Sequence, residues 1–305
     1  MILKQVEVSA ELVGRADRVV QTLTGLSRSE IRGLFDHDCV TVNGERCVSS
    51  GAGVVCGDVV EAHYDAHRRY HERPRPWEDD AFRIIMEDQH LIVVDKAAGV
   101  LTVPAHPGET NTVVHAISRY FEHRGFRERA QVVHRLDRDV SGLLVFAKSR
   151  EIAEKLQDQF EERKPEREYE AIVHGAMPAH GTFRSYLATS KNLQRYSTQH
   201  RDAGQLAVTH FELQRVVHGA SWVRVWLETG RRNQIRVHFA DAGHPVLGDP
   251  RYRPDLSSHP QWRLRRLALH AAVLGFRHPI TGTPLRFEAA PPAAMRSFVG
   301  EKRRS

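Results

Sequence analysis

The stretch VVHRLDRDVSGLLVFAKS, residues 132–149, decides most of the interpretation of this chain. It joins a charged turn at residues 134–139 to an uninterrupted apolar run, LLVFA, at residues 143–147. A short apolar run between polar segments is consistent with a buried strand. Charged side chains at the end of such a strand are costly unless paired, and they are well placed to act on a ligand over the sheet. The residues alone leave two interpretations open, a salt-bridged structural turn or a catalytic turn.

A second informative stretch is LETGRRNQIRVHFADAGHPVLGDPRY, residues 227–252. A strand candidate ends at Gly230, and a cluster of cationic and amide side chains follows it at once. Such a cluster suits contacts with the phosphates and base edges of a nucleic acid. The alternative is a solvated basic start of a helix. The cluster consists of Arg231, Arg232, Asn233, Gln234 and Arg236.

Composition excludes several classes of protein. The 305 residues are long enough for about two domains. Hydrophobic residues make up 41% of the chain and charged residues 27%, a composition that excludes a wholly disordered protein. No apolar run is long enough to cross a membrane, and the N-terminus lacks the apolar core of a signal peptide, so we expect a cytoplasmic protein. The 3 cysteines and 19 histidines lack the spacing of a metal site, so we expect no metal.

The charge is positive and uneven. Net charge is +6, and Lys plus Arg number 44, most of them Arg. Residues 1–62 carry 6 basic and 9 acidic side chains, a net of −3, whereas residues 81–305 carry 34 and 24, a net of +10. The excess predicts a polyanionic partner that is held mainly by the C-terminal part.

Three parts are expected along the chain. Residues 63–80, HYDAHRRYHERPRPWEDD, have the composition of a linker. It separates a module over residues 1–62 from a body over residues 81–300. Within the module, apolar spacing predicts two helices, the second capped by Ser27, and Asn43-Gly44 predicts a hairpin. The fold class expected is α+β, in which a small α/β module precedes a body with a mixed, mostly antiparallel sheet and flanking helices.

The small module resembles the alpha-L RNA-binding module of ribosomal proteins and tyrosyl-tRNA synthetases. The resemblance rests on Arg15 and Asp17 at the first helix, on Ser27 and Arg28 at the second, and on VNG in the hairpin. It implies a module that binds RNA through Arg15, Ser27, Arg28 and Arg32. The residues by themselves indicate only a small α/β cap.

The body resembles the RluA-like pseudouridine synthases over residues 83–292. HRLDRDVSGLLVFAKS resembles the family motif HRLDRxTSGLLLxAKS, and four further motifs follow the family's order. Arg167 stands where the family usually has Lys, and Asn233 where it usually has His. The four further motifs are LIVVDKAAGVLTVPA, REYEAIVHG, ETGRRNQIRVHFADAGHPVLGDPRY and RLALHAAVLGFRHPITGTPLRFEAAPP.

This resemblance implies an enzyme that isomerises uridine in RNA to pseudouridine on a flipped-out base. Asp137 would be the catalytic aspartate, acting as nucleophile or as base, with Arg236 as its cationic partner and Tyr169 in the base pocket. The reaction conserves atoms, so no cofactor is implied. The substrate-binding residues implied are Arg135, Arg231, Arg232, Gln234 and Ile235.

Alternatives stay open for the substrate and the activity. Family members with an alpha-L module commonly act on large-subunit ribosomal RNA, and transfer RNA is the second candidate. A non-catalytic RNA-binding relative and a glycosidase that uses Asp137 and Asp139 are the competing classes, although two carboxylates two residues apart flank a substrate poorly. We expect a monomer, since the sequence has no coiled-coil or exposed apolar stripe.

Overall fold

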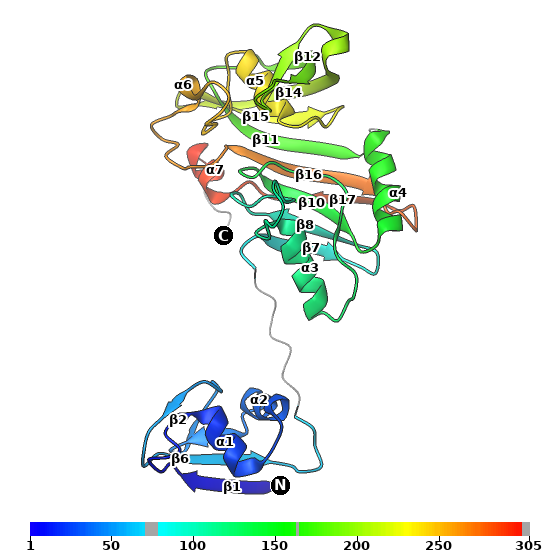
Figure 1. Cartoon of the computed structure of the whole chain (residues 1–305). Helices are drawn as coiled ribbons and strands as arrows, with labels where there is room; N and C mark the ends of the chain where they lie inside the picture. The colour runs from blue at the N-terminus through cyan, green and yellow to red at the C-terminus, as the bar shows by residue number, and fades with distance from the viewer. Residues whose placement is uncertain (71–78, 163–164, 301–305) are drawn as a thin grey trace. The chain divides into compact units, whose positions relative to one another are not determined.

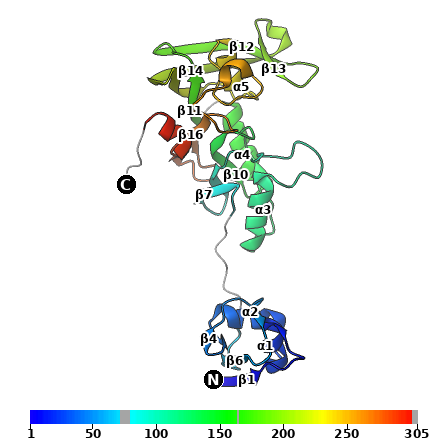
Figure 2. The same cartoon turned by 90° about the vertical axis from the view of Figure 1, so that its left-hand side faces the viewer.

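The computed structural model describes residues 1–70, 79–162 and 165–300, and the chain divides into two compact units, Met1–Trp77 and Glu78–Ser305 (Figures 1 and 2). The first unit extends beyond the expected boundary at residue 62. Its last strand ends at Tyr64, and buried Tyr70 packs into its core, where the Tyr70 hydroxyl accepts from the Asp65 amide at 2.9 Å. Because Tyr64 and Tyr70 pack in the core of the first unit, the start of the expected linker belongs to this unit. Most of the rest of that linker, residues 71–78, lies outside the described residues.

Two helices pack on a small sheet in the first unit. The helix pattern and the capping box predicted at Ser27 are confirmed, and Asn43 and Gly44 have φ of 53° and 79°, as a tight hairpin requires. The sheet order is β1-β6-β3-β4, and β2 pairs separately with β5. The elements are β1 (Ile2–Glu7), β2 (Gly14–Arg15), α1 (Ala16–Thr24), α2 (Arg28–Asp36), β3 (Val40–Val42), β4 (Glu45–Arg46), β5 (Gly53–Val54) and β6 (Val59–Tyr64).

The second unit is built on one 11-stranded sheet, mixed and mostly antiparallel as expected. The main path runs β13-β12-β14-β15-β11-β16-β10-β8-β7, with β17 on β16 and β9 on β10. The strands are β7 (Phe82–Glu87), β8 (Leu91–Lys96), β9 (Gln131–Val132), β10 (Ser141–Ala147), β11 (Glu166–His174), β12 (His180–Thr189), β13 (Arg195–Thr198), β14 (Gln205–Val217), β15 (Ala220–Leu227), β16 (Leu269–Arg277) and β17 (Pro284–Glu288).

Helices flank this sheet. α4 packs its apolar face on β10, and α5 lies beside β13 and β14 at the other end of the sheet (Figures 1 and 2). α3 begins at the cap Thr112 and α4 at the cap Ser149, whose hydroxyl accepts from the Ile152 amide. The helices are α3 (Val113–His123), α4 (Arg150–Glu161), α5 (Gln234–Asp241), α6 (Pro254–Ser257) and α7 (Ala293–Phe298), with a 3₁₀ turn at Arg201–Ala203.

The parallel pair β10–β16 anchors the charged turn in the middle of the sheet. Every residue of β10 is buried, as its apolar run predicts. Gly142 pairs with Ala271 at φ +116°, and a Cβ on Gly142 would lie 2.3 Å from the Ala271 carbonyl oxygen. Only glycine allows this approach of the two strands. The turn before β10 is therefore held against the strand that borders β11.

Candidate active site

Asp137 lies between β9 and β10, and its neighbours on both sides are tied down. The Thr102 hydroxyl donates to the Leu136 carbonyl at 2.8 Å and accepts from the Leu136 amide at 3.1 Å. The buried Lys96 ammonium donates to the Arg138 carbonyl at 2.9 Å. These bonds hold the Asp137 backbone in one position. The sequence analysis did not single out Lys96 or Thr102. The signal available in the sequence was that each is a polar residue inside or beside an apolar run.

Arg236, in the first turn of α5, contacts Asp137 through Nη1, which donates to Oδ2 at 3.1 Å. The same guanidinium donates from Nε and Nη2 to the two oxygens of Asp249, at 2.7 and 2.8 Å. The Asp249 side chain is 0% exposed. Burial opposes the charge of Arg236, but the bonds and charge of Asp249, followed by Asp137, outweigh it and raise the pKa of Arg236. The structure thus brings together the ion pair that the family resemblance implied across 99 residues.

Asn233, directly before α5, is a further neighbour of Asp137. With its amide nitrogen turned to the carboxylate it donates to Oδ2 at 2.8 Å and to Oδ1 at 3.0 Å, and its oxygen accepts from the Tyr252 hydroxyl at 2.9 Å. In the opposite orientation the amide oxygen would face only acceptors. Asn233 has φ +58°, a left-handed conformation that Asn tolerates better than most residues. Asp137 is therefore surrounded by donors from Arg236 and Asn233.

Tyr169 lies on β11, next to an irregularity in its pairing with β16. Burial raises the pKa of its phenol, Arg167 opposes the shift, and the charge of Asp137 adds to it. The ring therefore stays a neutral phenol at physiological pH. It lines the same small cavity as Asp137, so the structure brings the three predicted catalytic residues together.

The cavity over Asp137 has a volume of about 60 Å³. Its apolar wall consists of Leu136, Val140, Leu227, Ile235 and Leu269. Its polar lining consists of Arg135, Asp137, Tyr169, Arg231, Asn233, Gln234 and Arg236. A cavity lined by a carboxylate, an aromatic ring and apolar side chains is the arrangement expected of a pocket for a planar, uncharged base.

Comparison with known proteins gives the family. The profile described as RNA pseudouridylate synthase matches residues 90–241, which include Asp137, Tyr169 and Arg236. A protein of Zymomonas mobilis named ribosomal large subunit pseudouridine synthase D is 36% identical over 97% of this chain and 96% of its own length. This chain belongs to the RNA pseudouridylate synthase family. The resemblance to RluA-like synthases is thereby confirmed, and the chain is an RNA pseudouridine synthase.

Other relatives agree with this assignment. The synthases D of Pseudomonas aeruginosa and of Escherichia coli K12 are 35% and 32% identical, over 96% and 90% of this chain and 93% and 85% of theirs. The solved structure of human RNA pseudouridylate synthase domain containing 4 aligns with a TM-score of 0.58 at 22% identity, over 72% of this chain and 92% of the other. That structure supports the α+β fold of the synthase.

The predicted substrate residues lie in different environments around the synthase's cavity. Arg135 is exposed at its edge, and buried Ile235 forms part of its wall. Arg231 is partly buried and donates from Nε to the Leu206 carbonyl at 3.2 Å. Arg232 is exposed, donates to the Leu193 carbonyl at 2.6 Å and does not line the cavity. Of the arginines predicted to bind substrate, Arg135 and Arg231 therefore line the cavity and Arg232 does not.

Gln234 departs from the prediction that its amide binds substrate. Its oxygen accepts from the Thr229 hydroxyl at 2.8 Å and from the Arg231 amide at 3.0 Å. Its nitrogen donates to the Val208 carbonyl at 3.0 Å and to the Thr209 hydroxyl at 2.9 Å. All the hydrogen-bonding groups of the amide are thus used within the protein. Gln234 fixes the start of α5 and leaves no polar group for RNA.

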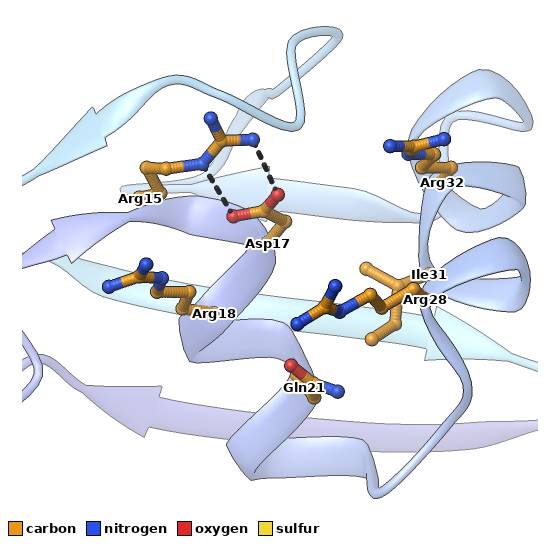
Figure 3. Close-up of a pocket in the computed structure, with 7 residues that line it drawn as sticks. All are labelled: Arg15, Asp17, Arg18, Gln21, Arg28, Ile31 and Arg32. Atoms are coloured by element: carbon orange, nitrogen blue, oxygen red, sulfur yellow. Dashed lines mark hydrogen bonds and ion pairs between the residues drawn. The ribbon is translucent and has the colours of Figure 1, made fainter.

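In the small module, four arginines surround a cavity of about 260 Å³ (Figure 3). Arg15 is held by Asp17 at 2.7 Å, whereas Arg28 and Arg32 extend from α2. Ser27 does not line this cavity, because its hydroxyl is engaged in the capping box with the Glu30 carboxylate and amide at 2.6 and 3.4 Å. The structure thus gives Ser27 a structural role. Sequence reasoning missed Arg18 and Gln21 on α1, which complete the lining.

Within residues 1–70, 79–162 and 165–300, no group of three or more His, Cys, Asp or Glu side chains could hold a metal ion. In the same ranges, no helix has both the length and the apolar character that a membrane crossing requires.

Proposed function

We propose that this synthase converts specific uridines of large-subunit ribosomal RNA to pseudouridine, and that it works as a monomer in the cytoplasm. The substrate proposal rests on the relatives that match nearly its whole length, which are named ribosomal large subunit pseudouridine synthases. The mechanistic proposal rests on one observation, the Asp137 carboxylate that Arg236 and Asn233 hold in the cavity that Tyr169 also lines.

At the ribose carbon, the reaction breaks one carbon–nitrogen bond and forms one carbon–carbon bond. The N-glycosidic bond between ribose and uracil is cleaved, the uracil turns, and its carbon 5 bonds to the ribose carbon. The hydrogen on carbon 5 then leaves and the freed nitrogen gains a proton, so atoms balance without an external reactant. Asp137 acts on the ribose, either as a nucleophile that holds it covalently or as a base that removes a sugar proton.

Arg236 and Asn233 keep the Asp137 carboxylate aimed at the sugar. Both donate hydrogen bonds to it, at 2.8–3.1 Å, which complements the charge and the acceptor oxygens of a carboxylate. Asp249, fully buried and bonded in a bidentate fashion, fixes the guanidinium plane. Positioning by such fixed groups supports catalysis because no reorganisation is needed as the bond breaks.

The base is held from above and from the side. Tyr169 offers a ring for stacking on the uracil face, and because burial raises its pKa the phenol stays neutral and its hydroxyl can donate a hydrogen bond. Exposed Arg135 at the cavity edge fills the gap that the flipped uridine leaves in the RNA. Ile235 and Leu269 supply the apolar wall that excludes water.

The small module contributes affinity for RNA. Arg15, Arg18, Arg28 and Arg32 converge on one cavity (Figure 3), an arrangement suited to backbone phosphates because each guanidinium offers a fork of donors. The module's net charge of −3 indicates that this cationic site is local. Substituting Arg28 by Gln is expected to weaken binding uniformly across RNA sequences.

The substrate is tested with RNA from a strain that lacks the gene. Purified synthase is incubated separately with large-subunit ribosomal RNA and with bulk transfer RNA, and pseudouridines are mapped before and after. New pseudouridine at discrete sites of large-subunit RNA alone supports the proposal. Modification confined to transfer RNA would redirect it to the second candidate substrate, and no new pseudouridine in either pool would contradict it.

A further inference from the structure

A second cavity adjoins the one over Asp137. Its volume is about 430 Å³, against about 60 Å³ for the first. The two share Arg135, Tyr169, Leu227 and Arg231 as lining residues. A molecule seated in the second cavity is therefore adjacent to the base in the first. The reaction on one uridine leaves this larger space unused.

Arg167 is one of three arginines that line this second cavity. It lies on β11, two residues before Tyr169, and its guanidinium lies over the Phe160 ring at 5.6 Å. Its Nε is buried and has no hydrogen-bond partner in the protein. A Cβ on Gly230 would lie 2.4 Å from its Nη1, so the missing side chain of Gly230 makes the room that this guanidinium occupies.

The positive charge around Arg167 is not neutralised by the protein. Burial lowers the pKa of Arg167, the Tyr169 phenol opposes the shift, and the nearby charge of Arg231 adds to it. Among the described residues, Arg135, Arg167 and Arg231 form no ion pair with a carboxylate, and the Glu161 side chain that also lines the cavity is exposed. Clustered guanidinium groups of this kind are complemented by a bound anion.

The aromatic lining is already engaged and does not favour a second base. Phe160 stacks on His134 with ring centroids 4.5 Å apart, and the guanidinium of Arg167 lies over the same Phe160 ring. The groups that remain open to a ligand are therefore guanidinium N–H donors, which match phosphate oxygens in geometry and charge.

We propose that this cavity binds the phosphodiester that flanks the target uridine, with the half-buried Arg167 as its anchor and Arg231 beside it. The proposal rests on the proposed function, since it takes RNA as the substrate of the adjoining site. It goes further by naming a subsite and a residue that set the position of the strand. An RNA seated this way directs its flipped uridine toward Asp137.

The test is a chemical double-mutant cycle on a short RNA that carries the mapped target uridine. Neutral methylphosphonates replace the phosphates around that uridine one at a time, and binding is measured with wild type and with Arg167→Gln. One position is expected to weaken wild-type binding about tenfold, and the same substitution is expected to have no further effect on Arg167→Gln. The variant itself should bind the unmodified RNA about tenfold more weakly, with a salt slope lower by about one.

Three further variants keep the result interpretable. Gly230→Ala retains the charge but displaces the guanidinium, and because its backbone is not left-handed it is expected to fold and to weaken binding like Arg167→Gln. Arg167→Lys, the residue usual in the family, should recover most of the affinity. Arg150→Gln, which removes an exposed arginine on α4, is the control for loss of charge alone and should bind as wild type does.

The outcomes separate the two proposals. If wild type makes no pseudouridine in the RNA, the proposed function fails, whatever the binding data show. If wild type is active but methylphosphonate effects are the same in wild type and Arg167→Gln at every position, the phosphate subsite is overturned. A loss of activity in Arg167→Gln without any change in affinity or salt slope would also overturn it.

Discussion

Replacing Asn233 by Gly is the sharpest perturbation of the site. Glycine tolerates the left-handed backbone, φ +58°, that this position has, so the change removes the amide without straining the chain. Asp137 then loses both bonds from Asn233, at 2.8 and 3.0 Å, and retains only Arg236. The substitution therefore isolates the orientation of one carboxylate.

The magnitude follows from the kind of bond removed. A hydrogen bond to a charged group contributes about 1.5–3 kcal/mol, and each 1.36 kcal/mol changes a rate by about tenfold. Because Arg236 still holds one carboxylate oxygen at 3.1 Å, we expect a loss near the lower end, about tenfold in kcat. RNA affinity should stay unchanged, since the Asn233 amide is bonded to Asp137 and Tyr252.

The assay is release of tritium from RNA labelled at carbon 5 of uracil, with binding measured separately. Asn233→His, which restores the family's usual residue, should recover most of the rate. Tyr252→Phe removes only the bond to the Asn233 oxygen and should cost about threefold or less. If Asn233→Gly turns over within twofold of wild type, or loses affinity and not rate, the amide does not orient Asp137.

Three further outcomes are expected. Arg236→Met leaves the buried Asp249 carboxylate without its cationic partner, so the free energy of unfolding measured in urea should fall by about 3–5 kcal/mol and activity should be lost. An unchanged free energy of unfolding would contradict the buried pair. Gly142→Ala puts a Cβ 2.3 Å from the Ala271 carbonyl oxygen, and should lower unfolding free energy by at least about 2 kcal/mol in the same assay. Burial, helped by Arg167, lowers the pKa of His134 to about 3. As the pH falls, the unfolded chain therefore takes up this proton before the folded chain does, and the free energy of unfolding should decrease by about 2 kcal/mol between pH 8 and pH 5. The ring resonances of His134 in the folded protein should show no titration in that range.

The sequence predicted the parts whose pattern is local. The apolar run of β10 and the charges before it indicated a buried strand preceded by a charged turn, and the Ser27 capping box predicted the start of α2. β12, β13 and β14 were not predicted, because polar residues such as Ser185 and Thr209 are among their buried positions and β13 buries none of its residues, so their sequences lack a clear apolar alternation. In β12, for example, Arg184 is exposed between half-buried Phe183 and buried Ser185.

The site itself could be predicted only in part. Asp137 and Arg236 are 99 residues apart, and only the family resemblance connected them before the structure did. The contact of Asn233 with Asp137 depends on a left-handed backbone that composition and periodicity do not reveal. For Gln234 the sequence suggested a contact that the structure does not support. Its polar side chain suggested substrate binding, but the amide is hydrogen-bonded within the protein to Thr229, Val208 and Thr209.

The central claim is that Asp137 carries out the chemistry on a uridine of RNA. Its most direct test compares wild type with Asp137→Ala in tritium release from carbon-5-labelled large-subunit ribosomal RNA of a strain that lacks the gene. We predict release by wild type, one tritium for each pseudouridine formed, and none above background from the folded variant with its RNA affinity retained. Release by Asp137→Ala at a rate near that of wild type would contradict the account.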